Sequence, residues 1–478
     1  MSSFTDRRAD FAAVIGDGIA VIPAAVEQVR NDDVHHEFRQ DSSFFFLTGF
    51  TEPDAVAVLD PTHPTERYVL FVRPRDRERE IWDGYRAGVE GAIERYDADA
   101  AFPIGDLADE LRRRLVGRTR VYVPPGRATE TVTSAIAALA PLAQRFGRPV
   151  PAEVVDPTPV LAELRQRKHP EELAALRTAC DISVEAHAEA MRFARPGIAE
   201  FQVQAAMEYV FRQRGSERNG YPSIVAGGPN ACVLHYVEND ALLGDGDLLL
   251  IDAGAEYGHH SADITRTFPV NGRFSPEQRA VYEVVLAAHR AAFDHAGPGG
   301  SLPAMHDAAV AVLTEGLVDL GLLPLGVDDS LAMAHYREFF MHGTGHWLGL
   351  DVHDAGSLRV DGEPLALEPG MTFTIEPGLY VAPDRETVEF TKLAVDPNER
   401  LERRLLLGAA EADRLEAEEA EGAETITFEV PEAFRGIGVR IEDDVLVTAD
   451  GWENLTAALP VDPDEVEALC AESPRLPL

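Results

Sequence analysis

The chain has 478 residues, of which 45% are hydrophobic and 26% charged, a composition that is ordinary for a globular protein and too apolar for wholesale disorder. Asp and Glu total 82 against 43 Lys and Arg, which gives a formal net charge of −39. So acidic a surface repels phosphates, which argues against nucleic acid or an anionic membrane as a partner.

The N-terminal third predicts an α/β domain over residues 1–160. Short β-rich runs at 55–59, 68–72 and 121–123 alternate with helix-like stretches such as 106–116. A Pro-rich segment then marks a domain boundary.

A long helical pattern follows from residue 159 to about 194, and it contains the helix-start signal His169-Pro170-Glu171-Glu172. The remainder of residues 161–460 predicts helices followed by mostly antiparallel strands, an α+β domain. Within it, the strongly acidic segment 382–430 is expected to be an inserted loop or a solvated helical excursion. Residues 461–478 are predicted to form a C-terminal tail.

The chain contains very few lysines and three widely spaced cysteines. Only Lys168 and Lys392 are lysines, so all other residues of the Lys and Arg total are arginine. GC-rich coding is one interpretation of this composition; the alternative is adaptation to a salt-rich cytoplasm, in which excess carboxylate keeps a protein hydrated. Three widely spaced cysteines without a C-x-x-C motif argue against a disulfide framework and against a thiolate metal site. With no apolar run of membrane-spanning length and no secretory signal pattern, we expect a cytoplasmic protein.

Two aspartates in DLLLIDAGAEYGHHSADITRTFPV are the first candidates for chemistry. If this segment is an antiparallel hairpin that turns at Tyr257-Gly258, Asp252 lies opposite Asp263, with Cβ atoms roughly 4.5–5.5 Å apart. Carboxylates this close repel each other unless a cation lies between them. A divalent metal site is one interpretation; two aspartates in loops beside a turn are the alternative.

A glycine-rich segment, MHGTGHWLGLDVHD, contains His342, His346 and His353 within twelve residues. A single histidine is more often structural than a ligand, but three in one such loop favour a functional site. The H-E-x-x-H pattern of zinc proteases is absent.

Two later strands supply further carboxylates. In MTFTIEPGLY the alternation places Glu376 at the end of a strand, on its polar side. In GVRIEDDVLVT, Arg440, Glu442 and Asp444 share one face. A buried glutamate needs a partner, and Arg440 is the structural alternative to a metal ion. Two Asp, two Glu and one His together suit Mn²⁺, with Co²⁺, Fe²⁺ or Zn²⁺ as alternatives.

The order of these motifs resembles the aminopeptidase P (Xaa-Pro aminopeptidase) branch of the pita-bread metallopeptidases. The matching segments are Asp-x10-Asp, H-G-x-x-H-W-L-G-L-D-V-H-D, I-E-P-G-L-Y and V-R-I-E-D-D. FRQDSSFFFLTGF and WDGYRAG resemble the N-terminal domain of that branch. The resemblance implies an α/β N-terminal domain and an α+β pita-bread catalytic domain. The acidic insert departs from the family by lengthening the spacing between the two glutamates.

The resemblance also implies the metal ligands of a site for two divalent ions. Asp252 would chelate one ion, and His346 and Glu376 the other. Asp263 and Glu442 would bridge both ions.

Further residues take roles by the same resemblance. His235 and His353 would contact the substrate, and His342 would line the same pocket. Tyr380 and Arg440 would orient the ligands.

The implied reaction is hydrolysis of the bond between an N-terminal residue and a proline by a hydroxide that bridges the two metal ions. His353 would donate a hydrogen bond to the developing oxyanion, and Glu376 would carry the proton to the proline nitrogen. A prolidase restricted to dipeptides is the alternative. A methionine aminopeptidase, which would lack the N-terminal domain, and a metal-free binding protein are less favoured. The resemblance further implies a homodimer or homotetramer, with Trp82 as a candidate subunit contact or a core residue.

Overall fold

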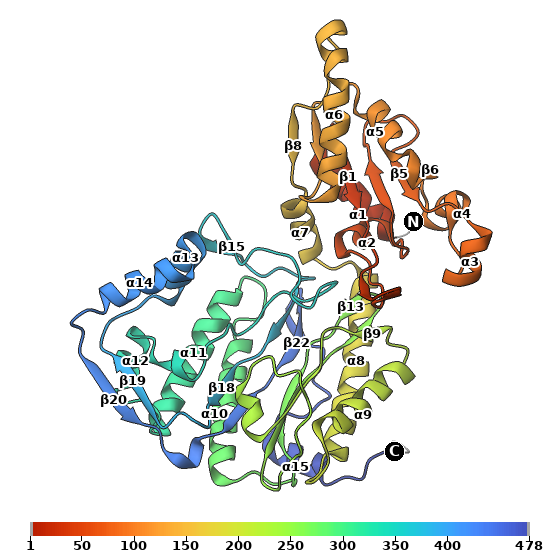
Figure 1. Cartoon of the computed structure of the whole chain (residues 1–478). Helices are drawn as coiled ribbons and strands as arrows, with labels where there is room; N and C mark the ends of the chain where they lie inside the picture. The colour runs from red at the N-terminus through yellow and green to blue at the C-terminus, as the bar shows by residue number, and fades with distance from the viewer. Residues whose placement is uncertain (1–2, 476–478) are drawn as a thin grey trace. The chain divides into compact units, whose positions relative to one another are not determined.

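The structure of the protein, a computed structural model, describes residues 3–475. The chain divides into two compact units, residues 1–166 and residues 167–478 (Figure 1). No helix in the described part of the chain is both long and apolar enough to cross a membrane.

Unit 1 is built on a mixed six-stranded sheet in the order β6-β5-β4-β1-β7-β8. Its strands are β1 Ile19–Pro23, β2 Val29–Asn31, β3 Val34–His35, β4 Val56–Leu59, β5 Tyr68–Val72, β6 Ala100–Pro103, β7 Arg120–Tyr122 and β8 Glu153–Val155. Its helices are α1 Ser3–Ile15, α2 Ser42–Thr48, α3 Arg77–Asp83, α4 Gly88–Tyr96, α5 Leu107–Leu115, α6 Arg127–Phe146 and α7 Thr158–Gln166. The predicted α/β class is therefore confirmed.

Local sequence signals account for several elements of unit 1. Asp41 caps α2 by accepting from the Phe44 N–H at 2.8 Å, and Gly49 ends that helix in the left-handed region. Strands β1, β4 and β5 are almost entirely buried apolar runs because helices cover the sheet. Trp82 on α3 is 85% exposed, so its interpretation as a core residue is wrong.

Unit 2 contains short strands that pair antiparallel in every named pair. They are β9 Arg218–Asn219, β10 Ile224–Gly227, β11 Leu248–Asp252, β12 Ala255–Tyr257, β13 His260–Ser261, β14 Thr265–Pro269, β15 Arg359–Val360, β16 Glu363–Pro364, β17 Thr372–Ile375, β18 Gly378–Val381, β19 Thr387–Thr391, β20 Thr425–Glu429, β21 Ile437–Arg440, β22 Asp443–Thr448 and β23 Gly451–Asn454. The helices are α8 Pro170–Phe193, α9 Glu200–Gln213, α10 Pro276–Phe293, α11 Leu302–Asp319, α12 Val327–Ala332, α13 Pro397–Leu407, α14 Ala409–Glu419 and α15 Pro463–Cys470. The α+β prediction is confirmed.

Two helix pairs flank the strands of unit 2 (Figure 1). Helices α8 and α9 pack against β11 and β14 in one hydrophobic core. Helices α10 and α11 pack against β18 and β21 in another. The polar residues of the site lie at the ends of these central strands.

The predicted hairpin register is wrong by two residues. The turn lies at Gly258-His259, where both residues have positive φ angles of 56° and 65°, as a two-residue type I′ turn requires. Asp252 therefore pairs with Thr265, while Asp263 lies just before β14. A shift of two residues preserves the face of the sheet, so both carboxylates still point into one site.

The helical pattern from residue 159 to 194 forms two helices rather than one. Because Pro170 cannot continue a preceding helix but fits the first turn of a new one, α7 ends at Gln166 and α8 starts at Pro170. The acidic segment contains the β19–β20 ladder and the α13–α14 hairpin (Figure 1). Within residues 461–475, α15 packs Val466 into the core beside α8.

Candidate metal centre

A cavity of about 500 Å³ in unit 2 gathers nearly all of the predicted site residues. Its walls come from the ends of β11 and β21, from the residues just before β14 and just after β17, from the segment after η2 (Gly228–Cys232), and from the glycine-rich loop after η3 (His335–Glu338). The lining includes His235, Asp252, Asp263, His342, His346, His353, Glu376, Arg440 and Glu442. These residues are spread over more than 200 sequence positions, so the fold itself assembles the cluster.

Three of the predicted ligands form a compact group. Ligand atoms of Asp263, His346 and Glu442 all lie within 4.8 Å of one another. The Nε2 of His346 is 3.4 Å from Oδ2 of Asp263 and 3.5 Å from Oε1 of Glu376. Four of the five predicted ligands thus surround one small space.

The orientation of His346 suits a metal ligand. Its Nδ1 lies 3.0 Å from the carbonyl oxygen of Trp347, so the ring donates a hydrogen bond from Nδ1. When the ring is neutral, its Nε2 lone pair points toward the carboxylates. A histidine fixed by such a backbone contact is the usual arrangement in metal sites.

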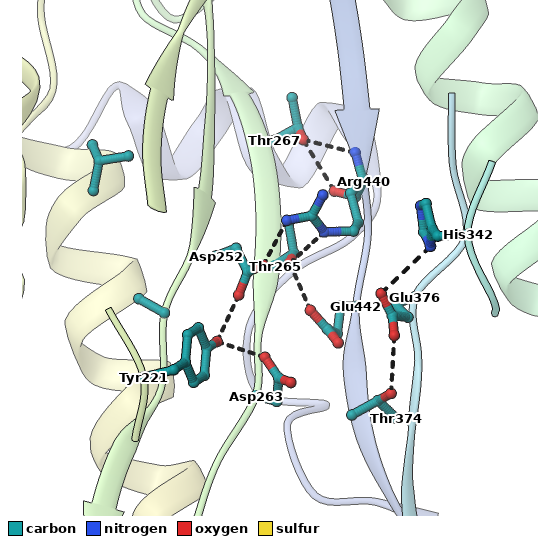
Figure 2. Close-up of polar contacts among 12 residues, drawn as sticks. Tyr221, Asp252, Asp263, Thr265, Thr267, His342, Thr374, Glu376, Arg440 and Glu442 are labelled. Atoms are coloured by element: carbon teal, nitrogen blue, oxygen red, sulfur yellow. Dashed lines mark hydrogen bonds and ion pairs between the residues drawn. The ribbon is translucent and has the colours of Figure 1, made fainter. Parts of the chain in front are cut away.

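Asp252, the fifth predicted ligand, lines the same cavity but has two close protein partners. Arg440 donates from Nη2 to its Oδ2 at 2.5 Å, and the Tyr221 hydroxyl lies 2.6 Å from its Oδ1. The same hydroxyl lies 2.5 Å from Oδ1 of Asp263. Tyr221 therefore joins the two aspartates (Figure 2).

Arg440 also organises the opposite wall of the site. Its Nη1 donates to the Tyr380 hydroxyl, which in turn lies 2.9 Å from Nε2 of His342. Because Nδ1 of His342 faces the Gly343 carbonyl at 2.7 Å, Nδ1 carries the proton and Nε2 accepts from Tyr380. The carboxylate that pairs with Arg440 is Asp252, and not Glu442 as the structural alternative in the sequence analysis expected. Glu442 instead accepts a hydrogen bond from the Thr265 hydroxyl at 2.6 Å.

The electrostatics show an excess of buried negative charge. Burial and the neighbouring carboxylate of Asp263 raise the pKa of Glu376 to about 7, and burial with the same neighbour raises the pKa of Glu442 well above its usual value. Burial also raises the pKa of Asp252. Although burial opposes it, the Asp263 and Glu376 carboxylates raise the pKa of His346 to about 9.

For His342 and His353 in the same cavity, the pKa is lowered instead. Burial and Arg440 lower the pKa of His342 to about 3. Burial and the nearby His346 lower the pKa of His353. These rings are therefore neutral near pH 7 and each can donate from only one nitrogen.

An adjoining cavity of about 300 Å³ shares His235, Asp252, Asp263 and His353 with the first. Its other lining residues are mostly apolar: Tyr221, Pro222, Ile224, Val237 and Val352. The two histidines thus lie where a polar chamber meets an apolar one.

The residues present fit divalent cations. Carboxylate oxygens with one imidazole are ligands for hard and borderline ions, and the raised carboxyl pKa values show that one arginine does not compensate the charge. His346 already has the orientation that such an ion requires. The site therefore has the donors, the charge and the space to hold metal ions.

One residue of the site, Tyr221, has no counterpart in the sequence analysis, whereas the family resemblance implies a hydroxyl from Thr265 for the first metal ion. Tyr221 lies in a loop between β9 and β10, and no local pattern marks it. Thr265 donates to Glu442 and accepts from Nε of Arg440 at 3.0 Å. It lies directly opposite Asp252 in the β11–β14 pair.

Comparisons with known proteins agree with this geometry. Residues 174–449 match metallopeptidase family M24, and residues 4–122 match the aminopeptidase P N-terminal domain. The chain is 40% identical over 454 residues to a Xaa-Pro aminopeptidase of Escherichia coli, covering 94% of this chain and 93% of the relative. It is 31% identical over 447 residues to human Xaa-Pro aminopeptidase 3, covering 93% of this chain and 79% of that relative.

Solved structures give the same result for the fold. The structure of Pseudomonas aeruginosa aminopeptidase PepP superposes with a TM-score of 0.87 at 45% identity, covering 98% of this chain and 97% of that one. A zinc-substituted Escherichia coli aminopeptidase P in complex with product superposes with a TM-score of 0.85 at 39% identity, covering 98% of each chain.

Proposed function

The chain belongs to metallopeptidase family M24, and from this premise we propose how its site removes an N-terminal residue that precedes proline. The protein is a metal-dependent aminopeptidase. Its similarity to Xaa-Pro aminopeptidases extends over nearly the whole chain. The observation that carries the proposal is the cluster of four carboxylates and one oriented imidazole in a single cavity.

We assign two divalent cations to this cluster, with Mn²⁺ as the favoured ion. Asp252, Asp263, His346, Glu376 and Glu442 would hold them. The four carboxylates carry four negative charges, which two divalent ions would balance. Oxygen-rich ligation favours Mn²⁺ over ions that prefer nitrogen or sulfur.

When bound, the ions would activate water and polarise the peptide carbonyl. Around them, His353 donates a hydrogen bond to the carbonyl oxygen as negative charge develops there, a task for which a neutral ring with one N–H suffices. Glu376 passes a proton to the proline nitrogen, because an unprotonated amide nitrogen is a poor leaving group. His235, which lines both cavities, is a second histidine that contacts the substrate.

Further residues hold these groups in place without touching the reacting atoms. Arg440 orients Asp252 through an ion pair of 2.5 Å. Tyr221 sets the spacing of Asp252 and Asp263, and Tyr380 fixes the ring of His342.

The substrate class follows from the chemistry of proline. The Xaa-Pro bond is a tertiary amide without an N–H, and its ring has a restricted shape, so a dedicated site is needed. The apolar cavity beside Asp252 and Asp263 suits the side chain of the first residue.

A peptide-length assay tests this function. The purified protein, loaded with Mn²⁺, is expected to hydrolyse Xaa-Pro-Yaa tripeptides and longer peptides faster than Xaa-Pro dipeptides, and to leave Xaa-Ala-Yaa peptides intact. A preference for dipeptides would favour the prolidase alternative, which the aminopeptidase relatives make less favoured. Cleavage of the alanine peptides at an equal rate would contradict proline specificity.

We further propose that the protein forms a homo-oligomer and that it is located in the cytoplasm. The first proposal rests on an exposed apolar group, and the second on the cysteines. Helix α3 exposes Ile81 at 75%, Trp82 at 85% and Tyr85 nearby at 91%, and an exposed apolar group of this kind is typical of a protein contact. Free cysteines at 180, 232 and 470 suit a reducing compartment. Light scattering of the wild type and of Trp82→Ala tests the assembly, since we expect a dimer or tetramer that the substitution weakens.

A further inference from the structure

One of the two lysines forms a buried ion pair beside the site. Nζ of Lys168 lies 2.9 Å from Oδ2 of Asp354, and both side chains are 1% exposed. Such a pair is costly to break, because removal of one partner leaves an uncompensated charge in the interior. The mechanism above uses neither residue.

The pair lies against a glycine that leaves room for a lysine. A Cβ atom built on Gly349 would meet Oδ2 of Asp354 at 2.3 Å and Cε of Lys168 at 2.8 Å. The broad, planar guanidinium of arginine differs in size and shape from the compact ammonium group that this close contact holds. The chain uses arginine at 41 of its 43 Lys and Arg positions but has lysine here.

Both ends of the pair are connected to fixed backbone. The Lys168 N–H donates to the Gly370 carbonyl at 2.9 Å, next to the start of β17. The Asp354 N–H donates to the Trp347 carbonyl at 2.8 Å, which closes the loop of residues 347–354. The loop is also tied to β13 through the Ser261 N–H and the Gly349 carbonyl, at 2.9 Å.

This loop carries a histidine of the cavity. His353 directly precedes Asp354 and lines both cavities, while the Asp354 carboxylate is buried against Lys168. Consecutive side chains thus face opposite ways, and a shift of Asp354 would move His353 relative to the substrate carbonyl.

We propose that the buried Lys168–Asp354 pair positions His353 for the reaction. The proposal rests on the proposed role of His353, since Lys168 and Asp354 act through that ring and contact no reacting atom. It makes both members of the pair positioning residues, and it identifies Gly349 as the residue that makes space for them.

A double-mutant cycle tests the proposal. With Xaa-Pro-Yaa as substrate, Lys168→Met is expected to lower kcat roughly 10- to 100-fold, the effect of a misplaced group, with a smaller change in KM. In a His353→Ala background the same substitution is expected to change kcat by less than about 2-fold, because the two residues act as one unit. Lys392→Met is the matched control; this other lysine pairs with Glu424 at 2.7 Å in the acidic insert, and we expect its kcat to equal that of the wild type.

Metal content and thermal unfolding are measured for every variant, so that kcat is compared only at equal metal loading in folded protein. If Lys168→Met does not fold, Asp354→Asn replaces it, because the amide keeps the size of the side chain and removes its charge. The positioning role would be overturned if folded Lys168→Met had the kcat of the wild type. It would also be overturned if Lys168→Met lowered kcat by the same factor in the wild-type and His353→Ala backgrounds. Either result would leave the proposed role of His353 intact. A wild-type kcat for His353→Ala itself would overturn the proposed role of His353 and the inference with it.

Discussion

In the metal-free protein, the buried Glu376 carboxyl should contribute a folding stability that falls as pH rises. In the metal-free fold the pKa of Glu376 is about 7, against 4.5 for an unperturbed glutamate, because the side chain is buried beside Asp263. The folded state therefore binds more protons than the unfolded state between these two values. Stability that is present below pH 4.5 is then lost as pH rises through 7.

The raised pKa of Glu376 sets the size of its contribution to the unfolding free energy. A rise of roughly 2.5 pKa units corresponds to about 3 kcal/mol of unfolding free energy. The pKa of His346 rises from 6.5 to about 9 because of Asp263 and Glu376, so its contribution is present below 6.5 and is lost toward 9, with the same sign. Since the two groups interact directly, their contributions do not add in full.

Urea unfolding of the stripped protein between about pH 5 and pH 8 measures this slope. Because the lowered pKa values of His342 and His187 act in the opposite direction up to about pH 6.5, the expected result is a difference between variants. Over this range the wild type should lose roughly 2–3 kcal/mol more than Glu376→Gln, which has no titrating carboxyl at this position. Added Mn²⁺ should stabilise the protein more at the upper end, because metal ions compete with protons for the ligands. An equal pH dependence in the stripped wild type and in stripped Glu376→Gln, or equal stabilisation by Mn²⁺ at both ends, would refute the reasoning.

Three substitutions test the surroundings of the site. Arg440→Leu leaves Asp252 buried without its cation, so we expect the unfolding free energy to fall by roughly 3–5 kcal/mol; an unchanged urea midpoint would contradict the ion pair. Tyr221→Phe removes the hydroxyl between the two aspartates and should weaken Mn²⁺ binding by roughly 10- to 100-fold, as titration calorimetry would measure. His353→Ala should lower kcat by roughly 10²–10³-fold with bound metal unchanged, whereas a loss confined to KM would argue against an oxyanion donor.

The sequence predicted the class of both units because patterning and turn residues agree with the fold. Buried apolar runs such as β5 and the helix start at Pro170 were recognisable from local spacing. The hairpin register was wrong because Tyr257-Gly258 and Gly258-His259 both offer a plausible turn. The positive φ of His259 decides between them, and a histidine gives little sign of that conformation in a sequence.

Which residues contact one another inside the site was harder to predict. Asp263 and Glu442 were recognisable as candidates because a buried carboxylate needs a partner, whereas only the family resemblance singled out His346 among the three histidines of its loop. The partner of Arg440 was not recognisable, because the pairing with Asp252 joins strands 188 positions apart in the sequence. Tyr221 was missed for the same reason, since its role exists only after the fold brings two distant aspartates to one hydroxyl.

The metal content of the purified protein tests the central claim most directly. After the protein is stripped, saturated with Mn²⁺ and freed of unbound ion by gel filtration, elemental analysis should find two equivalents per chain in the wild type and fewer in His346→Ala. A wild-type chain that retains no Mn²⁺ yet hydrolyses Xaa-Pro-Yaa at full rate would contradict the claim that this cluster of carboxylates and imidazole is a metal centre.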